Sequence, residues 1–158
     1  MPALRSMTPA DVPAILELNE RNVVKLAPLD EPRLERFREW AGRVDVVDVD
    51  GAFAGFVITF AAGSAYDSEN FRWFAERYDD FGYLDRIVLH EDFRRRGLGS
   101  FAYDAVEDVA RPHGRLTLEV NLVPRNDPSL AFHAGRGYLE VGRIGDEHHL
   151  VSLMEKPL

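Results

Sequence analysis

A basic, glycine-rich turn between an apolar run and a helical pattern constrains this chain more than any other feature. Residues 83–89 (YLDRIVL) predict a strand, residues 94–100 (RRRGLGS) form the turn, and residues 101–106 (FAYDAV) begin a helix. Glycines let successive backbone N–H groups converge on an anion, and the positive end of the helix and the arginines attract it further. The pattern predicts a pyrophosphate-binding loop.

Two other phosphate-loop patterns fit the turn less well. Residues 97–102 match G-x-G-x-x-A, the dinucleotide fingerprint, and Glu119 lies at about the distance of its ribose-binding acid. In that fingerprint the first glycine follows the strand almost at once, whereas residues 90–96 intervene here, and Glu119 stands inside an apolar run. The Lys-Ser or Lys-Thr pair of a Walker loop does not follow the glycines. The remaining pattern is R-x-x-G-x-G.

This R-x-x-G-x-G turn, together with the strand before it, resembles the acetyl-CoA loop of the GNAT superfamily of N-acetyltransferases. Residues 126–138 are similar to a second motif of that family, which has an Asn, a short helix and a terminating Gly-aromatic pair. The resemblance spans nearly the whole chain, is strong over residues 83–140 and is weak over residues 61–82. One departure concerns His133, which stands where many relatives have a tyrosine.

The resemblance implies direct transfer of an acetyl group from acetyl-CoA to a primary amine of a small molecule or peptide. The expected cosubstrate contacts come from the strand backbone, the basic turn and one Asn: Ile87, Val88, Leu89, Arg94, Arg95, Arg96, Gly97, Leu98, Gly99, Ser100 and Asn126. Asn126 is equally natural as a helix N-cap. Three alternatives stay open: another acyl-CoA donor, a hydroxyl acceptor, and a catalytically weak acyl-CoA-binding module.

The resemblance also implies two catalytic side chains. His133 would protonate the departing thiolate, because an imidazolium with a pKa of about 6.5 is a stronger acid than a phenol of about 10, provided that a neighbouring acid holds this pKa up against burial. The alternative is a helix-surface histidine without a role. Asp85 is favoured as the base that deprotonates the amine, and Glu119 is the second candidate. Either carboxylate could instead be a half-exposed strand residue or the partner of an arginine.

Composition excludes several function classes. With 158 residues and 46% hydrophobic content, the chain suits one domain over residues 1–158. The sequence has no cysteine, which excludes disulfides, thiolate metal sites and an acyl-cysteine intermediate, and its remaining histidines lack metal-ligand spacing. The net charge of −8 disfavours nucleic acid and favours a cationic substrate. We expect no bound metal, no membrane-spanning segment and a cytoplasmic location. The sequence is compatible with a homodimer.

Periodicity predicts a mixed, mainly antiparallel α/β sheet with helices on both faces. The expected strands are residues 4–7, 44–49, 52–60, 82–90, 116–121, 138–144 and 149–155. Helices are expected after residues 8–11, after residues 30–32 as far as Gly42, from the basic turn to about Pro112, and over residues 127–136.

Residues 61–82 form an aromatic and acidic insertion with two interpretations. In the first, aromatic side chains at helical spacing pack against the sheet as core. In the second, the segment is a lid over the acceptor site, where acids and aromatic rings would suit an amine through charge pairing and cation–π contact. The two interpretations are compatible.

Overall fold

The computed structural model describes residues 1–24 and 26–158 of the chain. Its strands are β1 (Pro2–Ser6), β2 (Arg43–Val49), β3 (Ala52–Ala61), β4 (Gly82–Leu89), β5 (Arg115–Val123), β6 (Leu139–Gly145) and β7 (Leu150–Pro157). Its helices are α1 (Val12–Arg21), α2 (Glu31–Glu39), α3 (Glu69–Ala75), α4 (Leu98–Ala110) and α5 (Asp127–Gly135), with 3-10 turns η1 (Pro9–Asp11), η2 (Glu91–Phe93) and η3 (Arg111–His113).

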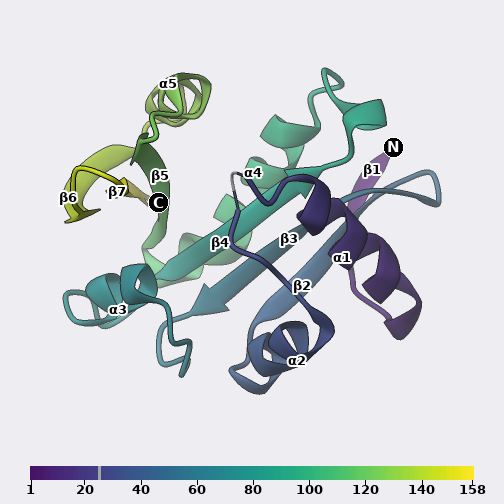
Figure 1. Ribbon diagram of the computed structural model, residues 1–158, viewed down its shortest axis with the longest axis horizontal. Helices are drawn as coiled ribbons and strands as arrows, with labels where there is room; N and C mark the ends of the chain where they lie inside the picture. Colours follow the sequence, from purple (N-terminus) through teal and green to yellow (C-terminus); the bar gives the residue numbers. More distant parts are fainter. Residues whose placement is uncertain (25) are drawn as a thin grey trace.

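The seven strands form one sheet in the order β1-β2-β3-β4-β5-β7-β6. Within the described part of the chain, β4 and β5 are the one parallel pair, and every other neighbouring pair is antiparallel. The expectation of a mixed, mainly antiparallel sheet is confirmed. The sheet divides into β1–β4 and β5–β7, which diverge in Figure 1.

Helices cover both faces of the sheet and bury two apolar clusters. Side chains of α1, α2 and α3 pack on one face, with Ile15, Phe37 and Phe74 each 0% exposed. On the other face, α4 buries Leu98, Ala102, Val106 and Ala110 against β4 and β5. These α4 residues are spaced four positions apart, which places them on one face of the helix.

Local signals place most element ends as expected. Thr8 and Asp11 form the capping box at the first helical turn, and residues 50–51 connect β2 to β3. Helix α2 is the exception, because it ends at Glu39 rather than at Gly42. There Ala41 takes a left-handed conformation at φ 59°, and the Gly42 N–H donates to Phe37 O at 2.7 Å. The left-handed residue Ala41 therefore ends α2 before Gly42 is reached.

The aromatic insertion, residues 61–82, contains α3 and fills space on the α1/α2 face. Tyr66, Phe71, Phe74 and Phe81 are buried. Trp73 is half-buried and lies against β6. The aromatic side chains thus behave as core, which agrees with the first interpretation of this segment.

In residues 1–24 and 26–158 no helix combines the length and the apolar character needed to cross a membrane.

Candidate active site

The site lies where β4 and β5 part. These strands pair at only two positions, Gly82 with Leu116 and Tyr83 with Thr117, after which they diverge. A cavity of about 770 Å³ opens between them and is lined from both faces of the sheet. Arg94, Gly99 and Tyr103 line it on the α4 face, and α5 lines it there as well.

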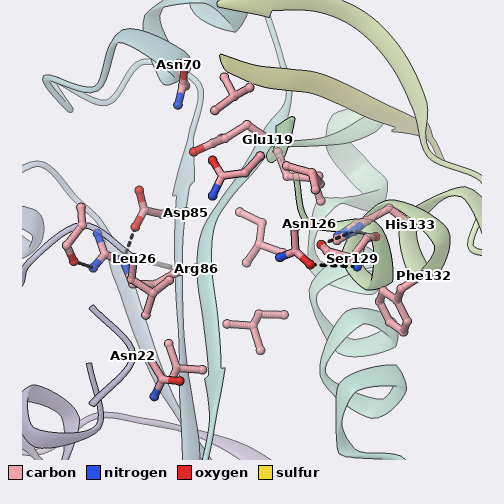
Figure 2. A pocket seen from close by; sticks show the side chains of 18 of the residues that line it. Asn22, Leu26, Asn70, Asp85, Arg86, Glu119, Asn126, Ser129, Phe132 and His133 are labelled. Carbon is pink, nitrogen blue, oxygen red and sulfur yellow. Dashed lines mark hydrogen bonds and ion pairs between the residues drawn. The ribbon is translucent and has the colours of Figure 1, made fainter. Parts of the chain in front are cut away.

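The opposite face contributes the other wall of this cavity. Residues 26–27, between α1 and α2, line it there together with Tyr66, Ser68 and Asn70 from the insertion. Figure 2 shows Asp85, Glu119 and Asn70 on one side of the cavity and α5 on the other. The insertion therefore supplies polar side chains to the site in addition to aromatic side chains to the core.

Beyond Gly82 and Tyr83, the β4 edge that faces the gap pairs with no strand of the described residues. The His90 N–H donates to Ala54 O of the neighbouring strand β3 at 2.8 Å. Because N–H directions alternate along an antiparallel strand, the N–H groups of Leu89 and Ile87 point toward the gap, whereas that of Val88 points to β3. Of the three strand residues expected to bind the cosubstrate, two present main-chain donors to the cavity.

The basic turn has the geometry of an anion site. Gly97 is the N-cap of α4 in the left-handed conformation at φ +72°, and within the described residues no side chain caps this helix end. The first N–H groups of α4 are therefore available to a ligand. A Cβ added at Gly97 or Gly99 would meet no atom of the described chain within 4 Å, so the space above the loop is open. These features fit a pyrophosphate.

The expected loop arginines differ in their surroundings. Arg94 lines the cavity. Arg95 has a left-handed backbone at φ 63°, and the Arg96 guanidinium lies 5.1 Å from the centre of the Phe93 ring. All three are exposed, as are the neighbouring positions Gly97 and Ser100. Of the three arginines of this turn, Arg94 is thus the one that lies against the cavity.

Asp85 sits at a β-bulge of β4. The β3 partner changes from Ile58, opposite Arg86, to Thr59, opposite Leu84, so Asp85 is the extra residue. The bulge turns two consecutive side chains to one face, and Arg86 Nε donates to the Asp85 carboxylate at 2.6 Å. Tyr66 donates its hydroxyl to the other carboxylate oxygen. Both oxygens of Asp85 are therefore engaged.

Arg86 is fixed in turn by the α1 side of the fold. It is buried, and its Nη1 donates to Asn19 Oδ1 and Ala27 O, each at 3.0 Å. The Asp85–Arg86 pair is a hydrogen-bonded ion pair on the α1/α2 side of the cavity. The positive charge of Arg86 is therefore paired with Asp85 inside the protein.

Glu119 is the less restrained carboxyl of the site. The Tyr83 hydroxyl donates its one hydrogen to this carboxyl, with the two carboxyl oxygens at 2.7 and 3.0 Å. Burial, followed by the nearby charge of Asp85, raises the pKa of Glu119 to about 7, and the hydrogen bond from Tyr83 opposes this rise. Glu119 thus changes protonation near neutral pH.

Register explains why these two acids face the same space. Tyr83 pairs with Thr117, and Asp85 and Glu119 each lie two residues further along their strands. Side chains two apart share a face, so both carboxyls emerge on the α1/α2 face just where the strands separate. The α1/α2 side of the cavity therefore carries the carboxyl groups of Asp85 and Glu119.

His133 lies on α5 at the other end of the cavity and is 5% exposed. Its Nδ1 is 2.7 Å from Ser129 O, and its Nε2 is 2.7 Å from the Tyr103 hydroxyl. Burial lowers the pKa of His133, and the nearby cation Arg136 adds to this, while the hydrogen bond to Ser129 opposes it. The neutral imidazole is favoured. Among the described residues no carboxylate contact holds this pKa up, as sequence reasoning required for an acid.

Asn126 lines the cavity and also caps α5. Its Oδ1 accepts from the Ser129 N–H at 3.3 Å. Sequence reasoning missed Tyr103 as a site residue and treated Tyr66 only as an aromatic of the insertion. The signal for Tyr103 was a hydroxyl-bearing side chain one turn beyond Gly99, on the helix that follows the basic turn. Tyr66 gave no signal beyond its aromatic ring.

In the described residues, no group of three or more His, Cys, Asp or Glu side chains is placed to hold a metal ion.

Comparisons with known proteins agree with this geometry. The family model of the GNAT acetyltransferases matches residues 12–138. No curated protein sequence matches the chain. A ribosomal-protein-alanine N-acetyltransferase from Brucella melitensis is similar in structure, at TM-score 0.72 and 22% identity over 99% of both chains. Ard1 from Thermoplasma volcanium aligns at TM-score 0.74 and 20% identity, over 99% of this chain and 97% of that one.

A third similar structure was determined with a ligand. It is yncA, a putative acetyltransferase from Salmonella typhimurium with its cofactor acetyl-CoA, at TM-score 0.69 and 18% identity over 99% of this chain and 94% of that one. The chain belongs to the GNAT family of acetyltransferases. It is an acyltransferase with acetyl-CoA as its cosubstrate.

Proposed function

We propose that this chain is an N-acetyltransferase that moves the acetyl group of acetyl-CoA directly to a primary amine of a cationic small molecule or peptide. Glu119 carries the proposal. It is a carboxyl with a pKa of about 7, and it lies at the acidic end of a cavity whose other end is an anion-binding loop. A base at one end and a phosphate site at the other suit amine acylation by a phosphate-bearing donor.

Glu119 would act as the base. An amine is protonated at neutral pH, and it must lose a proton before its nitrogen can attack a carbonyl carbon. A carboxyl with a pKa near the working pH is suited to accept that proton. The Tyr83 hydroxyl orients the carboxyl through its two contacts.

Asp85 was the favoured base from sequence, and this role stays a prediction. Its two engaged oxygens support a different role, in which Asp85 does not touch the amine and its charge keeps the pKa of Glu119 high. The two roles differ in the effect of Asp85→Asn, which is worked out in the Discussion.

Acetyl-CoA supplies an activated thioester to this site. The α4 N-terminus and Arg94 would hold its phosphates, and the free N–H groups of Ile87 and Leu89 would bind its arm and polarise its carbonyl. The sequence has no cysteine, which leaves direct transfer to the amine as the route we propose.

The test is thiol release from acetyl-CoA in the presence of matched acceptors. We expect product with a diamine and with a peptide bearing a free N-terminus, weaker use of an amino acid whose carboxylate adjoins the amine, and none with the hydroxyl analogue of the diamine. Mass spectrometry of the acceptor identifies the amide. Acetyl-CoA binding without turnover on any amine would favour a binding module, and faster release from a longer acyl-CoA would reassign the donor.

The cytoplasmic location and the homodimer allowed by the sequence stay predictions.

A further inference from the structure

We propose that Tyr103, on α4, donates the proton to the departing thiolate, and that His133 is the positioning residue that aims its hydroxyl. This proposal rests on the proposed acetyl transfer. It moves the acid from the α5 position expected from sequence to the helix that follows the phosphate loop.

The hydrogen-bond partners of His133 fix where its proton lies. A backbone carbonyl can only accept, so the contact from Nδ1 to Ser129 O at 2.7 Å requires a hydrogen on Nδ1. In the neutral ring Nε2 is then an acceptor, and the Tyr103 hydroxyl, 2.7 Å away, is its donor. The neutral imidazole has no proton to give on its Nε2 side, whereas Tyr103 has one.

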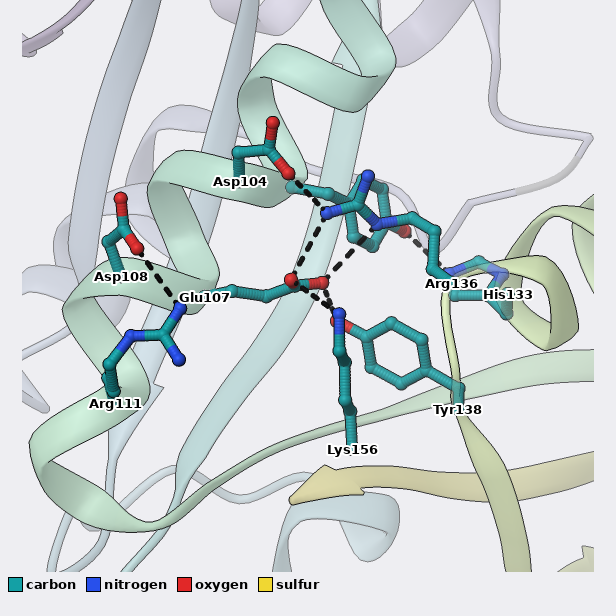
Figure 3. A network of polar contacts seen from close by, with 9 residues as sticks. Asp104, Glu107, Asp108, Arg111, His133, Arg136, Tyr138 and Lys156 are labelled. Atoms are coloured by element: carbon teal, nitrogen blue, oxygen red, sulfur yellow. Dashed lines mark hydrogen bonds and ion pairs between the residues drawn. The ribbon is translucent and has the colours of Figure 1, made fainter. Parts of the chain in front are cut away.

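Arg136 favours the same assignment. Its guanidinium lies 5.5 Å from the centre of the Tyr103 ring and is fixed by Asp104 at 2.7 Å and by Glu107 at 3.1 Å. Glu107 is itself held by Lys156, as Figure 3 shows. This fixed cation opposes the imidazolium form of a neighbouring histidine and stabilises the phenolate form of a neighbouring tyrosine.

Arg136 lowers both pKa values. Burial raises the pKa of Tyr103, Arg136 opposes that rise, and the charges of Glu107 and Glu119 add to it, so this pKa stays above its ordinary value. For His133, burial and Arg136 both lower the pKa. The hydroxyl of Tyr103 therefore carries its proton at neutral pH, and a charged His133 is disfavoured.

The two ends of the cavity lie on opposite faces of the sheet. Tyr103 lines it from the α4 face, and Glu119 lines it from the α1/α2 face, with the parted strands between them. The charge of Glu119 also acts on the pKa of Tyr103, so both groups belong to one electrostatic environment. A base on one side and an acid on the other suit a reaction in which the amine enters from one face and the thiol leaves toward the other.

Glu119 and Tyr103 serve the proton transfers at nitrogen and at sulfur. Glu119 takes one proton from the ammonium, and the nitrogen lone pair forms a bond to the carbonyl carbon. The nitrogen of the tetrahedral adduct then loses its second proton to solvent. The carbon–sulfur bond breaks with its electron pair on sulfur, and the Tyr103 hydroxyl turns from His133 Nε2 and gives its proton to that sulfur. Water in the cavity carries the proton from Glu119 back to the Tyr103 oxygen, so the products are the amide, the free thiol and one released proton.

The first test is Tyr103→Phe, which removes the hydroxyl and keeps the ring. We expect kcat to fall by about 10²- to 10⁴-fold, the range for a positioned proton donor, with the acetyl-CoA Kd unchanged by calorimetry. Tyr78→Phe is the matched control. It removes the hydroxyl of a half-buried tyrosine of the insertion, and Tyr78 does not line the cavity. The control should leave kcat and the acetyl-CoA Kd near wild type.

A double-mutant cycle with His133→Ala separates the positioning of the Tyr103 hydroxyl from the donation of its proton. If His133 acts through Tyr103, His133→Ala lowers kcat, and the double variant is no slower than Tyr103→Phe alone. Multiplying losses would assign His133 an independent role and overturn the proposal, as would a Tyr103→Phe variant that turns over at the wild-type rate. A wild-type chain that releases no thiol with any amine overturns the proposed function instead.

Discussion

Replacing Glu119 with Gln should make the protein more stable in alkaline solution while it loses activity. The fold raises the pKa of Glu119 from 4.5 to about 7, so the folded state favours the neutral carboxyl. Stability from this group is fully present below pH 4.5 and is lost as pH rises through about 7. The amide introduced by Glu119→Gln would keep an oxygen that accepts from Tyr83 and would never ionise.

The size of this effect follows from the shift. The gap between the two pKa values, at about 1.4 kcal/mol per unit, makes the ionised carboxylate cost about 3 kcal/mol above pH 8. This is an upper bound, because part of the side chain faces a cavity that water reaches. For a chain of this length it corresponds to a melting temperature about 6 to 12 °C higher for Glu119→Gln at pH 9.

The assay is thermal unfolding of both proteins at pH 5 and pH 9. The two curves should converge at pH 5 and separate at pH 9. At pH 9 kcat should fall by about 10²- to 10⁴-fold, and at pH 5 the loss should be smaller, because most of the wild-type carboxyl is protonated there. Glu20→Gln, at an exposed position of α1, controls for the loss of one negative charge. A Glu119→Gln protein that melts at or below wild type at pH 9 would refute the reasoning that burial raises this pKa.

Three further changes test the rest of the site. Because the charge of Asp85 raises the pKa of Glu119, Asp85→Asn should move the acid limb of the kcat/KM profile to lower pH, whereas complete loss of turnover would show that Asp85 is itself the base. Gly99→Glu places a side chain in open space at a position without a left-handed φ, so the melting temperature should hold while calorimetry shows no acetyl-CoA binding. Arg94→Ala should raise the KM for acetyl-CoA by about 10- to 100-fold, since a charge-assisted contact is worth about 1.5 to 3 kcal/mol, and Arg95→Ala, off the cavity wall, should change it little. Equal effects of the two arginine changes would contradict the placement of the phosphates beside Arg94.

Most of the fold follows from sequence because its signals are local. Capping at Thr8 and the Asp50–Gly51 turn depend on neighbours within a few residues, and the structure has both of them. The phosphate loop is local in the same sense. A strand, glycines and a helix start suffice to identify it.

The catalytic pairings depend on contacts that sequence spacing does not encode. The bulge at Asp85 comes from how β3 and β4 align, and it places the Asp85 carboxylate where Arg86 donates to it. The contact between Tyr103 and His133 joins two side chains that are 30 residues apart and lie on different helices. The burial that lowers the pKa of His133 is also a property of the packed molecule. Sequence reasoning could name these side chains as candidates, but it could not assign their protonation states.

The short pairing of β4 with β5 also makes the molecule two half-sheets held together by two residue pairs and the packed helices. Beyond Tyr83 and Thr117, each half ends in an open strand edge. A pantetheine arm that bonds to the free groups of Ile87 and Leu89 would act as a short extra strand along one of these edges. The cosubstrate would then be a structural element of its own enzyme. The amide protons of Ile87 and Leu89 should exchange more slowly once acetyl-CoA binds, and the two half-sheets should unfold as one unit rather than as two.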